Sequence, residues 1–356
     1  MSRAITTKLD ERAVWRRYQS NFPRHLQAVA RHLQTEAMKN LAENCNHSDL
    51  RLSFEAFIAL IGPNGTRLTD IANAMAVSKQ ACNQSANAIE NAGYIQRISD
   101  PSDGRAKLLT LTARGETLRS DGIKVVAAIQ TQLTQMSGAQ AMATAIAALG
   151  KLSSALSILM PGNRGVDNHR AELGGLLPRL SSYIDNRQMA LTISKGHPGL
   201  KMSYATVLRR IGPSGDRIQH MAASQGVSKQ AISAIATDLE RLGYVSRRPD
   251  QWNAQRVVLQ FTDRGRELIA DSVACTDEIE AEFEAIVGHN SLRHLRRTFE
   301  SLYKALQLEN DAESDNSSVD IGALSQQLIK QLGQRGAEAL AARLLAPGRN
   351  RGFSNG

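Results

Sequence analysis

The chain has 356 residues, a formal net charge of +9 and a hydrophobic content of 42%, little of it aromatic. This length suits two or three globular domains. The three cysteines without CxxC spacing and the lack of a long apolar run argue against a disulfide framework, a structural zinc site, a secretory leader or a membrane span. We therefore expect a cytoplasmic protein without metal or cofactor, whose basic charge favours a polyanionic partner.

The first predicted element is helical. Residues 12–44 carry apolar side chains at the spacing of one or two helices, from Trp15 through Leu26 and Leu33 to Leu41. The stripe of apolar positions is long enough to line a helical interface.

Residues 66–92 have the spacing of a helix-turn-helix. Thr66 is placed to cap the first helix, and Ser78 to cap a second helix that Gly93 stops. Two short helices joined by so tight a turn need a small residue where they cross, and Ala72 meets that need.

Residues 94–112 follow as a predicted β-hairpin, or wing. Positions 94–98 alternate like a strand, 100–105 are rich in turn residues, and 107–111 return as a second strand. Thr112 is then placed to cap a long helix. A helix-turn-helix with a wing is a DNA-reading shape, in which the second helix enters the major groove and the wing reaches the backbone or minor groove.

Two more helices are predicted over residues 113–136 and 139–159. The later one carries an apolar stripe that includes Met142, Leu149 and Leu156. A Pro-Gly-Asn-Arg-Gly break at 161–165 ends this part of the chain.

The chain then repeats its central part. Residues 53–115, moved along by 150 positions, align without a gap with residues 203–265, and 22 of the 63 positions are identical. Two copies are too few for a solenoid, which needs about three or more. We therefore interpret the chain as an internally duplicated, fused pseudo-dimer, joined by long helices of the kind that dimers share.

The second copy is predicted to contain the same elements. Asp216 with Gln219 forms a capping-box pattern, and Gly226 sits in the turn, where a positive φ is needed. The expected ranges are a helix-turn-helix over 216–242, a wing over 244–262, and flanking helices over 170–194 and 266–308.

The predicted fold is mainly α with small β-hairpins. We divide it into two winged halves, residues 1–160 and 161–308, and a tail, residues 309–356. The tail is expected to begin with a flexible acidic linker, to continue over 321–345 as an amphipathic helix, and to end in a basic stretch. That helix docks on the pseudo-dimer or pairs with another chain, so further homodimerisation stays open.

These motifs resemble the multiple-antibiotic-resistance-regulator (MarR) family. The resemblance rests on Val-Ser-Lys-Gln at 77–80, Asp-Pro-x-Asp-x-Arg at 100–105 and Leu-Thr-x-x-Gly at 111–115. It covers most of residues 10–160 and, a second time, 170–308. It implies subunits that interlock through long terminal helices, two winged heads on adjacent turns of double-stranded DNA, and in many members a repressor released by small phenolic ligands or thiol oxidation.

The candidate DNA-binding residues lie on the second helix and the wing of each copy. Gln and Asn side chains pair with adenine, and lysine at a helix N-terminus contacts phosphate or remains a solvated surface charge. The wing arginine of the first copy reaches the minor groove or forms an ion pair with the wing aspartate. The set comprises Ser78, Lys79, Gln80, Ala81, Asn83, Gln84, Arg97, Asp103, Arg105 and Lys107, and in the second copy Ser228, Lys229, Gln230, Ala231, Ser233, Arg247, Arg248 and Arg256.

The two copies depart from the resemblance in opposite ways. The first has an intact wing, in which Asp103 is expected to anchor the hairpin and help hold Arg105. In the second, the aspartate is lost and Arg256 is displaced by one residue, which would turn it to the other strand face. The second helix of the first copy carries small Cys82 and Ser85 at positions that we expect to be buried and that are isoleucines, 232 and 235, in the second copy.

Several other residues leave alternatives open. Trp252 at the second wing tip is an apolar wedge for DNA or packs on its own hairpin. Cys82 is a small buried hydrophobe or a redox sensor, and Cys45 and Cys275 are equally undecided. His47 and His197 recur at one register and fit loop contacts better than metal sites. The acidic run over 277–284 is expected to be a solvated helix face.

The sequence thus predicts a sequence-specific DNA-binding transcription regulator that is expected to act as a repressor. It would bind an imperfect palindrome and a small-molecule effector that its residues do not identify. The alternative is a protein-interaction or antirepressor module that keeps the winged fold and has lost DNA binding in one or both heads. An enzyme is not expected, because no metal-ligand cluster, phosphate loop or nucleophile–base pattern is found.

Overall fold

The computed structural model describes residues 8–75, 77–158, 172–213, 215–225, 227–250 and 253–308. Its contacts divide the chain into two compact units. The first unit joins residues up to 200 with residues 269–308, and the described part of the second unit is 201–268.

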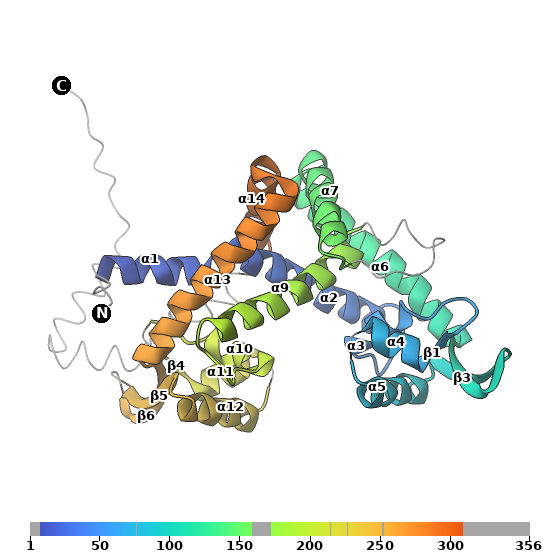
Figure 1. The fold of residues 1–356 in the computed structure, drawn as a ribbon, viewed down its shortest axis with the longest axis horizontal. Helices are drawn as coiled ribbons and strands as arrows, with labels where there is room; N and C mark the ends of the chain where they lie inside the picture. The colour runs from blue at the N-terminus through green and yellow to red at the C-terminus, as the bar shows by residue number, and fades with distance from the viewer. Residues whose placement is uncertain are drawn as a thin grey trace, which may run out of the picture. The chain divides into compact units, whose positions relative to one another are not determined.

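Long helices form most of the first unit (Figure 1). Asn21 starts α2 by accepting a hydrogen bond from the Arg24 amide, and Pro23 sits in the first turn, where its missing N–H is harmless. The helices are α1 (Lys8–Gln19), α2 (Phe22–Glu43), α6 (Ala113–Ser137), α7 (Ala139–Ala155), α9 (Leu173–Ser194), α13 (Asp263–Val287, of which residues from 269 belong here) and α14 (His289–Ala305).

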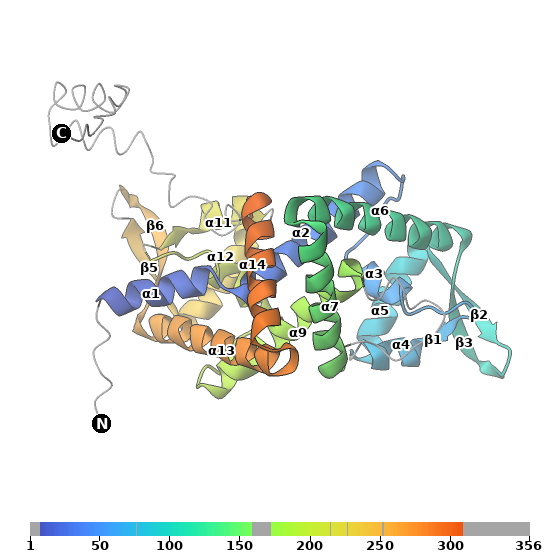
Figure 2. The ribbon, with the colours of Figure 1, turned by 90° about the horizontal axis from the view of Figure 1, so that it is seen from above.

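One hydrophobic core holds these helices together. Helix α2 packs against α6, α9 and α14, and α7 lies beside α14, as Figure 2 shows from above. Leu26, Leu149, Leu180 and Phe299, from four different helices, are almost fully buried in this core. The predicted apolar stripes of the long helices are therefore the surfaces that pack together.

The prediction that the acidic run over 277–284 is a solvated face is confirmed for Asp277 and Glu278, which are exposed, and is wrong for Glu280. Glu280 is only 2% exposed and accepts hydrogen bonds from Arg17 of α1 and Arg296 of α14. Glu282 accepts a hydrogen bond from the Tyr183 hydroxyl at 2.7 Å. Burial and this carboxylate raise the pKa of Tyr183 to about 12. Glu280 and Glu282 therefore contact partners that are distant in sequence, and the spacing of residues along one helix cannot reveal such partners.

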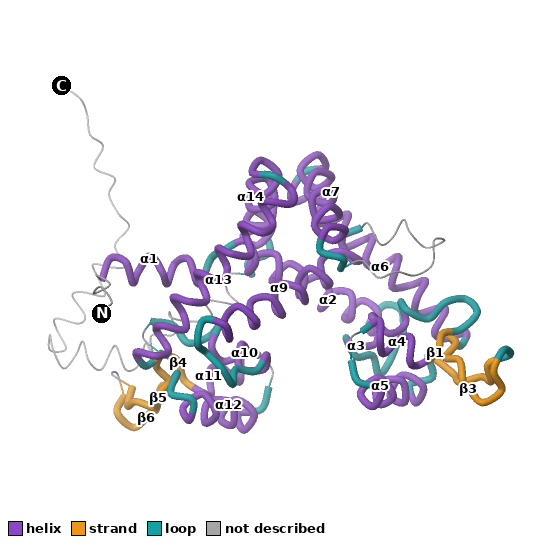
Figure 3. Tube along the Cα trace, in the orientation of Figure 1, coloured by secondary structure: helices purple, strands orange, loops and turns teal. Residues whose placement is uncertain are grey.

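The first unit also contains a winged helix-turn-helix, which we call the first head (residues 53–112). Its three strands form an antiparallel sheet in the order β1-β3-β2, with Thr66 opposite Leu109 and Ile95 opposite Leu111 (Figure 3). The elements are α3 (Ser53–Ile58), β1 (Thr66–Arg67), α4 (Leu68–Ala74), α5 (Lys79–Asn91), β2 (Ile95–Asp100) and β3 (Asp103–Leu111).

Most of the predicted ends of these elements are confirmed, and one is wrong. Ser78 accepts a hydrogen bond from the Ala81 amide as the N-cap of α5, and Thr112 caps α6 in the same way. Thr66 does not cap α4. It lies in β1, where its hydroxyl donates to the Leu60 carbonyl and accepts from the Gly62 amide. Pairing with β3 therefore overrides the capping preference of this threonine.

A steric constraint explains why the last position of the Leu-Thr-x-x-Gly motif is a glycine. A Cβ added to Gly115 would lie 2.0 Å from the Tyr94 carbonyl oxygen, which is far inside van der Waals contact. The first turn of α6 can pass the start of the wing only because no side chain stands there. Gly265 meets the Tyr244 carbonyl in the same way, at 2.1 Å.

The second unit contains a winged helix-turn-helix with the strand order β4-β6-β5, which we call the second head (residues 202–262). Asp216 does not form the predicted capping box with Gln219. It lies in β4, and its carboxylate accepts hydrogen bonds from the Arg217 amide and from His220. The elements are η1 (Met202–Tyr204), α10 (Ala205–Leu208), β4 (Asp216–Arg217), α11 (Ile218–Gln225), α12 (Lys229–Arg241), β5 (Val245–Asp250) and β6 (Asn253–Phe261).

Some predictions fall on parts that the structure does not describe. They concern Gly226 in the turn of the second head, Trp252 at its wing tip, and the whole tail from residue 309. Among the helices that are described, none combines the length and the apolar character that crossing a membrane requires.

Candidate DNA-binding surface and adjoining cavity

The N-terminal half of α5 presents a polar face to solvent. Lys79, Gln80, Ala81, Asn83 and Gln84 are all exposed. The opposite face of the helix holds it on the head, and its buried members are Cys82, Ala86 and Ile89. The predicted base-reading residues therefore share one accessible face at the start of a 13-residue helix, where the unpaired backbone amides and the helix dipole favour an anionic group.

The expected burial of two positions on this helix is only partly confirmed. Cys82 is 1% exposed, and its counterpart Ile232 in α12 is equally buried. Ser85 and Ile235 are half-buried, so they lie at the edge of the helix interface rather than inside it.

Arg97 is part of a network that the sequence analysis missed. It is ion-paired with Glu90 at the end of α5, and its Nη2 donates to Asn87 Oδ1 at 2.8 Å and to Asn83 Oδ1 at 3.2 Å. The network fixes the Asn83 amide with its oxygen toward the wing and its NH₂ group available. Asn83 therefore offers the groove mainly donors, whereas Gln80 and Gln84 keep both amide atoms for the paired contact with adenine.

The second head has a smaller version of this network. Arg247 is ion-paired with Glu240 and donates from Nη2 to Thr237 Oγ1 at 3.0 Å. Ser233 is half-buried, and its backbone carbonyl accepts a hydrogen bond from Thr237 Oγ1 at 3.0 Å, whereas its side chain does not contact Arg247. Ser228 caps α12, and the exposed predicted residues around it are Lys229, Gln230 and Ala231, with Arg248 exposed on β5.

The wing of the first head is tied to its helix-turn-helix by Arg67. Arg67 Nε donates to Asp100 Oδ2 at 2.8 Å, and its Nη2 lies 3.7 Å from Asp103 Oδ2. Ser102 donates from its hydroxyl and its amide to the other oxygen of Asp100. These bonds from Ser102, followed by those from Arg67, lower the pKa of Asp100 to about 2. Asp103 thus lies within ion-pair distance of Arg67, which had no sequence signal, and its expected role in holding Arg105 stays a prediction.

The two wings differ on their exposed strands. Lys107 of β3 is paired with Ser99 and donates to its hydroxyl at 3.0 Å. The residue at the same register position of β6 is Val257, which pairs with Pro249 and is 50% exposed. Arg256 occupies the register position of Ala106 rather than that of Arg105. The side chains of Arg105 and Arg256 are outside the described part.

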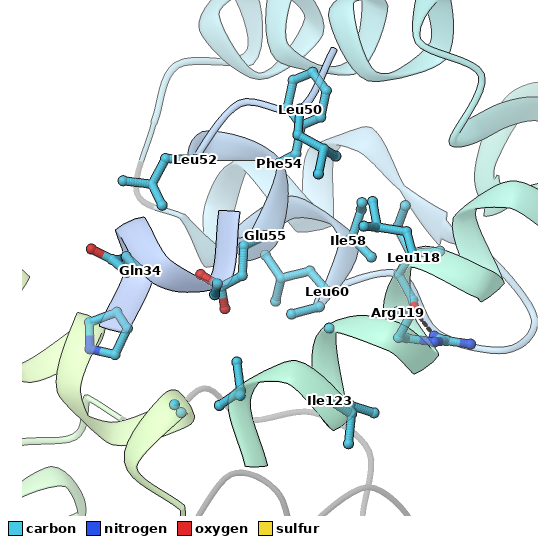
Figure 4. Close-up of a pocket in the computed structure, with 18 of the residues that line it drawn as sticks. Gln34, Leu50, Leu52, Phe54, Glu55, Ile58, Leu60, Leu118, Arg119 and Ile123 are labelled. Atoms are coloured by element: carbon cyan, nitrogen blue, oxygen red, sulfur yellow. Dashed lines mark hydrogen bonds between the residues drawn. The ribbon is translucent and has the colours of Figure 1, made fainter. Parts of the chain in front are cut away.

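A cavity of about 660 Å³ adjoins the first head within the first unit. Its walls come from α2, α3, the 59–66 segment, α4, α6 and the start of α9. Figure 4 shows the Glu55 side chain pointing from α3 toward this space, with Leu60 on the same side and Ile123 on α6 across it. Arg119 also lines the cavity but donates to the Ile61 carbonyl and is ion-paired with Glu116. Glu55, Leu60, Arg119 and Ile123 carry no local sequence signal, because the cavity walls lie far apart in sequence.

The surroundings of Cys82, Cys275, His47 and His197 fit structural roles better than redox sensing or metal binding. Burial raises the pKa of the Cys82 and Cys275 thiols, which disfavours the reactive thiolate. His47 and His197 are each 4% exposed and contact Asp121 and Asp271, at 3.2 and 3.0 Å. Within the described ranges no group of His, Cys, Asp or Glu is arranged to hold a metal ion.

Comparisons with known proteins point to one family. The MarR family model matches residues 56–106, and none of the curated proteins compared with the chain matches it. Among solved structures, CouR from Rhodococcus jostii RHA1 bound to p-coumaroyl-CoA shares 20% identity over 39% of this chain and 95% of its own, with a TM-score of 0.31. The transcriptional regulator Tm0710 from Thermotoga maritima shares 17% identity over 37% of this chain and 91% of its own, with a TM-score of 0.31. A MarR-family transcriptional regulator from Rhodococcus sp. RHA1 shares 21% identity over 39% of this chain and 96% of its own, with the same TM-score of 0.31.

The matched residues run from α3 into β3 and so include both helices of the helix-turn-helix and the tip of the wing. Regulators of this family are not enzymes. Residues 56–106 therefore carry the sequence pattern of the MarR family of transcriptional regulators.

Proposed function

We propose that the protein is a sequence-specific DNA-binding repressor that acts as a single-chain pseudo-dimer on an imperfect palindrome. The observation that carries this proposal is the exposed N-terminal face of α5, with Gln80 and Gln84 beside Lys79. A helix of this kind fits the major groove, where glutamine pairs with adenine and lysine contacts phosphate.

The pseudo-dimer accounts for the two heads. The aligned segments 53–115 and 203–265 share their strand order and many residues, including Ser-Lys-Gln-Ala at the start of α5 and α12. Identical subunits read identical half-sites, whereas this chain presents Asn83 and Gln84 in one head and Ser233 and Ala234 in the other. We infer that the stronger base specificity lies under the first head.

We further propose that a small-molecule effector acts through the cavity. One wall of the cavity is the 61–66 turn and α4 of the first head, and the opposite walls are the long helices α2 and α6. A ligand that fits only one arrangement of these walls shifts the population toward that arrangement. Because α4 packs directly against α5, that shift changes how the reading helix is presented.

A second candidate function applies to the second head alone. Val257 exposes half of its surface at the position where the first wing has Lys107. Apolar surface in place of a basic residue favours contact with a protein over contact with phosphates. The second head would then recruit a protein partner while the first binds DNA.

Fluorescence anisotropy with the full chain tests these proposals. The DNA is the region upstream of the protein's own gene, with a scrambled duplex of equal length, each at two salt concentrations. We expect preference for the native sequence, weaker binding at higher salt because phosphate contacts release counterions, and a loss of about tenfold or more in affinity for Gln80→Ala and for Arg105→Ala.

The matched controls in the second head are Gln230→Ala and Gln255→Ala, at the positions that align with Gln80 and Arg105. Smaller effects of these two variants support the asymmetric reader, and equal effects support a symmetric one. Equal, weak binding to native and scrambled DNA, unchanged by Gln80→Ala and Arg105→Ala, refutes DNA reading and leaves protein binding as the function of both heads.

A further inference from the structure

Two long helices of the first unit share one pattern of buried positions. Helices α2 and α9 pack against each other in the core (Figure 2), and Gln27 of α2 donates to Asp185 Oδ1 of α9 at 2.8 Å. Each residue that is buried in α9 lies 151 positions after a buried residue of α2. The pairs are Phe22 and Leu173, His25 and Leu176, Leu26 and Leu177, Val29 and Leu180, Leu33 and Ile184, and Leu41 and Thr192. One spacing of core-facing residues therefore serves both sides of this contact.

The sequence of the tail carries this pattern a third time. When Ile321 is aligned with Leu173, all but one of the positions that are buried in α9 are apolar in the tail. The aligned tail residues are Ile321, Leu324, Ser325, Leu328, Leu332 and Leu340. Between Leu328 and Leu340, the positions that are exposed in both α2 and α9 are polar in the tail, namely Lys330, Gln334 and Glu338. The expected helix over 321–345 thus has the apolar and the polar side of a helix of this type.

The connection to the tail also resembles the connection to α9. Helices α7 and α14 are each followed closely by a non-glycine residue with positive φ, Ser157 and Gln307, which lie 150 positions apart. Seventeen residues (156–172) separate α7 from α9, and 15 residues (306–320) separate α14 from the start of the tail pattern. The tail pattern therefore follows α14 in the sequence much as α9 follows α7.

The equivalent places in the first unit are already filled. Helix α9 packs against α7, and α2 packs against α14. A tail helix could enter either place only by expelling α9 or α2, whose core residues such as Leu180 and Leu26 are almost fully buried. That exchange would expose as much apolar surface as it covers, whereas contact with a second tail exposes none. A single helix of this length is only marginally stable in water, so its apolar side needs a partner.

We propose that the tail is a self-association helix, and that residues 321–345 of two chains pack on each other in the way that α2 packs on α9. The partner is a second copy of this chain, and the contact is isologous, with the same leucine side on both copies. Leu328 and Leu332 lie in the middle of that side. The inference goes beyond the proposed function and does not depend on DNA binding.

Sedimentation velocity of the full chain, without DNA and over a wide range of micromolar concentrations, tests the proposal. We expect a reversible equilibrium between one chain and a species of twice its mass. The double variant Leu328→Asp with Leu332→Asp places charges in an apolar contact and should raise the dimer dissociation constant by about a hundredfold or more. Gln334→Asp is the matched control, because it adds the same charge to the polar side, and it should change that constant by less than about threefold.

Three results overturn the proposal. The first is a native chain that remains monomeric at every concentration, and the second is a dimer that the double leucine variant leaves unchanged. The third comes from urea denaturation at a concentration where the chain is monomeric. The native chain and the double variant should unfold at the same urea concentration, whereas a lower midpoint in the variant would show that the tail docks on its own core.

Capture of two DNA duplexes separates this inference from the proposed function. Two chains joined at their tails carry four heads, so a DNA-binding assembly should hold a fluorescent and an immobilised operator duplex together, and the double leucine variant should not. Joint capture that the double variant leaves unchanged overturns the self-association. A dimer that depends on Leu328 and Leu332 but binds neither duplex supports the self-association and refutes the regulator.

Discussion

Arg67 at the end of β1 donates two hydrogen bonds to a single carboxylate oxygen of Asp100 at the end of β2. Since β1 leads directly into α4, this contact connects the helix-turn-helix to the tip of the wing. Asp103, on the other side of the turn, lies close enough to add an ion pair. The direction of the wing is thus fixed by a residue outside the hairpin.

Removing this contact should loosen the wing without unfolding the head. We expect Arg67→Ala to increase amide hydrogen exchange in residues 95–111 and to reduce DNA affinity by about tenfold, the effect of losing one wing contact. Arg67→Lys keeps the charge but loses the planar fork. Near-native affinity in Arg67→Lys with no change in exchange would show that only the charge matters.

Arg97 should set base specificity without touching a base. It holds the Asn83 oxygen, and Arg97→Ala releases the Asn83 amide to turn and to pair in other ways. We expect the preference at the base pair under Asn83 to relax by about 1–3 kcal/mol, measured by anisotropy against operators with each base pair at that position. Arg247→Ala is the control, because its network reaches only the backbone carbonyl of Ser233, through Thr237, and does not hold the Ser233 side chain. A uniform loss across all operators would indicate a phosphate contact instead.

Gly115 should be the least replaceable glycine of α6. A Cβ there meets the backbone of Tyr94, which cannot move without disturbing the wing, so Gly115→Ala should lower the free energy of unfolding by about 2 kcal/mol or more. Gly150 in α7 has nothing within 4 Å of an added Cβ. Gly150→Ala should raise the free energy of unfolding by about 0.5–1 kcal/mol through helix propensity. Urea denaturation measures both, and similar values for the two variants would contradict the steric explanation.

His25 should make stability depend on pH. It lies between Ser20 and the ring of Tyr303, and burial lowers its pKa from 6.5 to about 4. Between these two pKa values this histidine is protonated in the unfolded chain and neutral in the folded chain. The free energy of unfolding therefore decreases as pH falls from about 6.5 to about 4. The decrease is on the order of 1–3 kcal/mol.

His25→Phe should flatten this part of the stability curve, measured by urea denaturation at several pH values. The phenyl ring keeps a contact with Tyr303 and has no titrating group. An unchanged slope in His25→Phe would assign the pH dependence to other groups.

The helix-turn-helix and wing were predictable because their signals are local. Ser78 and Thr112 cap helices that follow them directly, and the alternation of apolar and polar residues from 94 to 111 fixes the hairpin. Where two local preferences competed, the prediction was wrong. Thr66 and Asp216 have capping chemistry, but both lie in short strands that pair with a segment about 43 residues later.

By itself the sequence determined the order of the elements, the match of residues 56–106 to the MarR family and the identity of the exposed residues on α5. These depend on spacing along the chain and on which face of one helix is apolar. The tertiary structure alone decided that Arg67 holds the wing, that Glu280 is buried between two arginines and that Glu55 lies in a cavity. Each of these depends on side chains brought together from distant segments. The burial and the partners of a carboxylate exist only once those segments have packed.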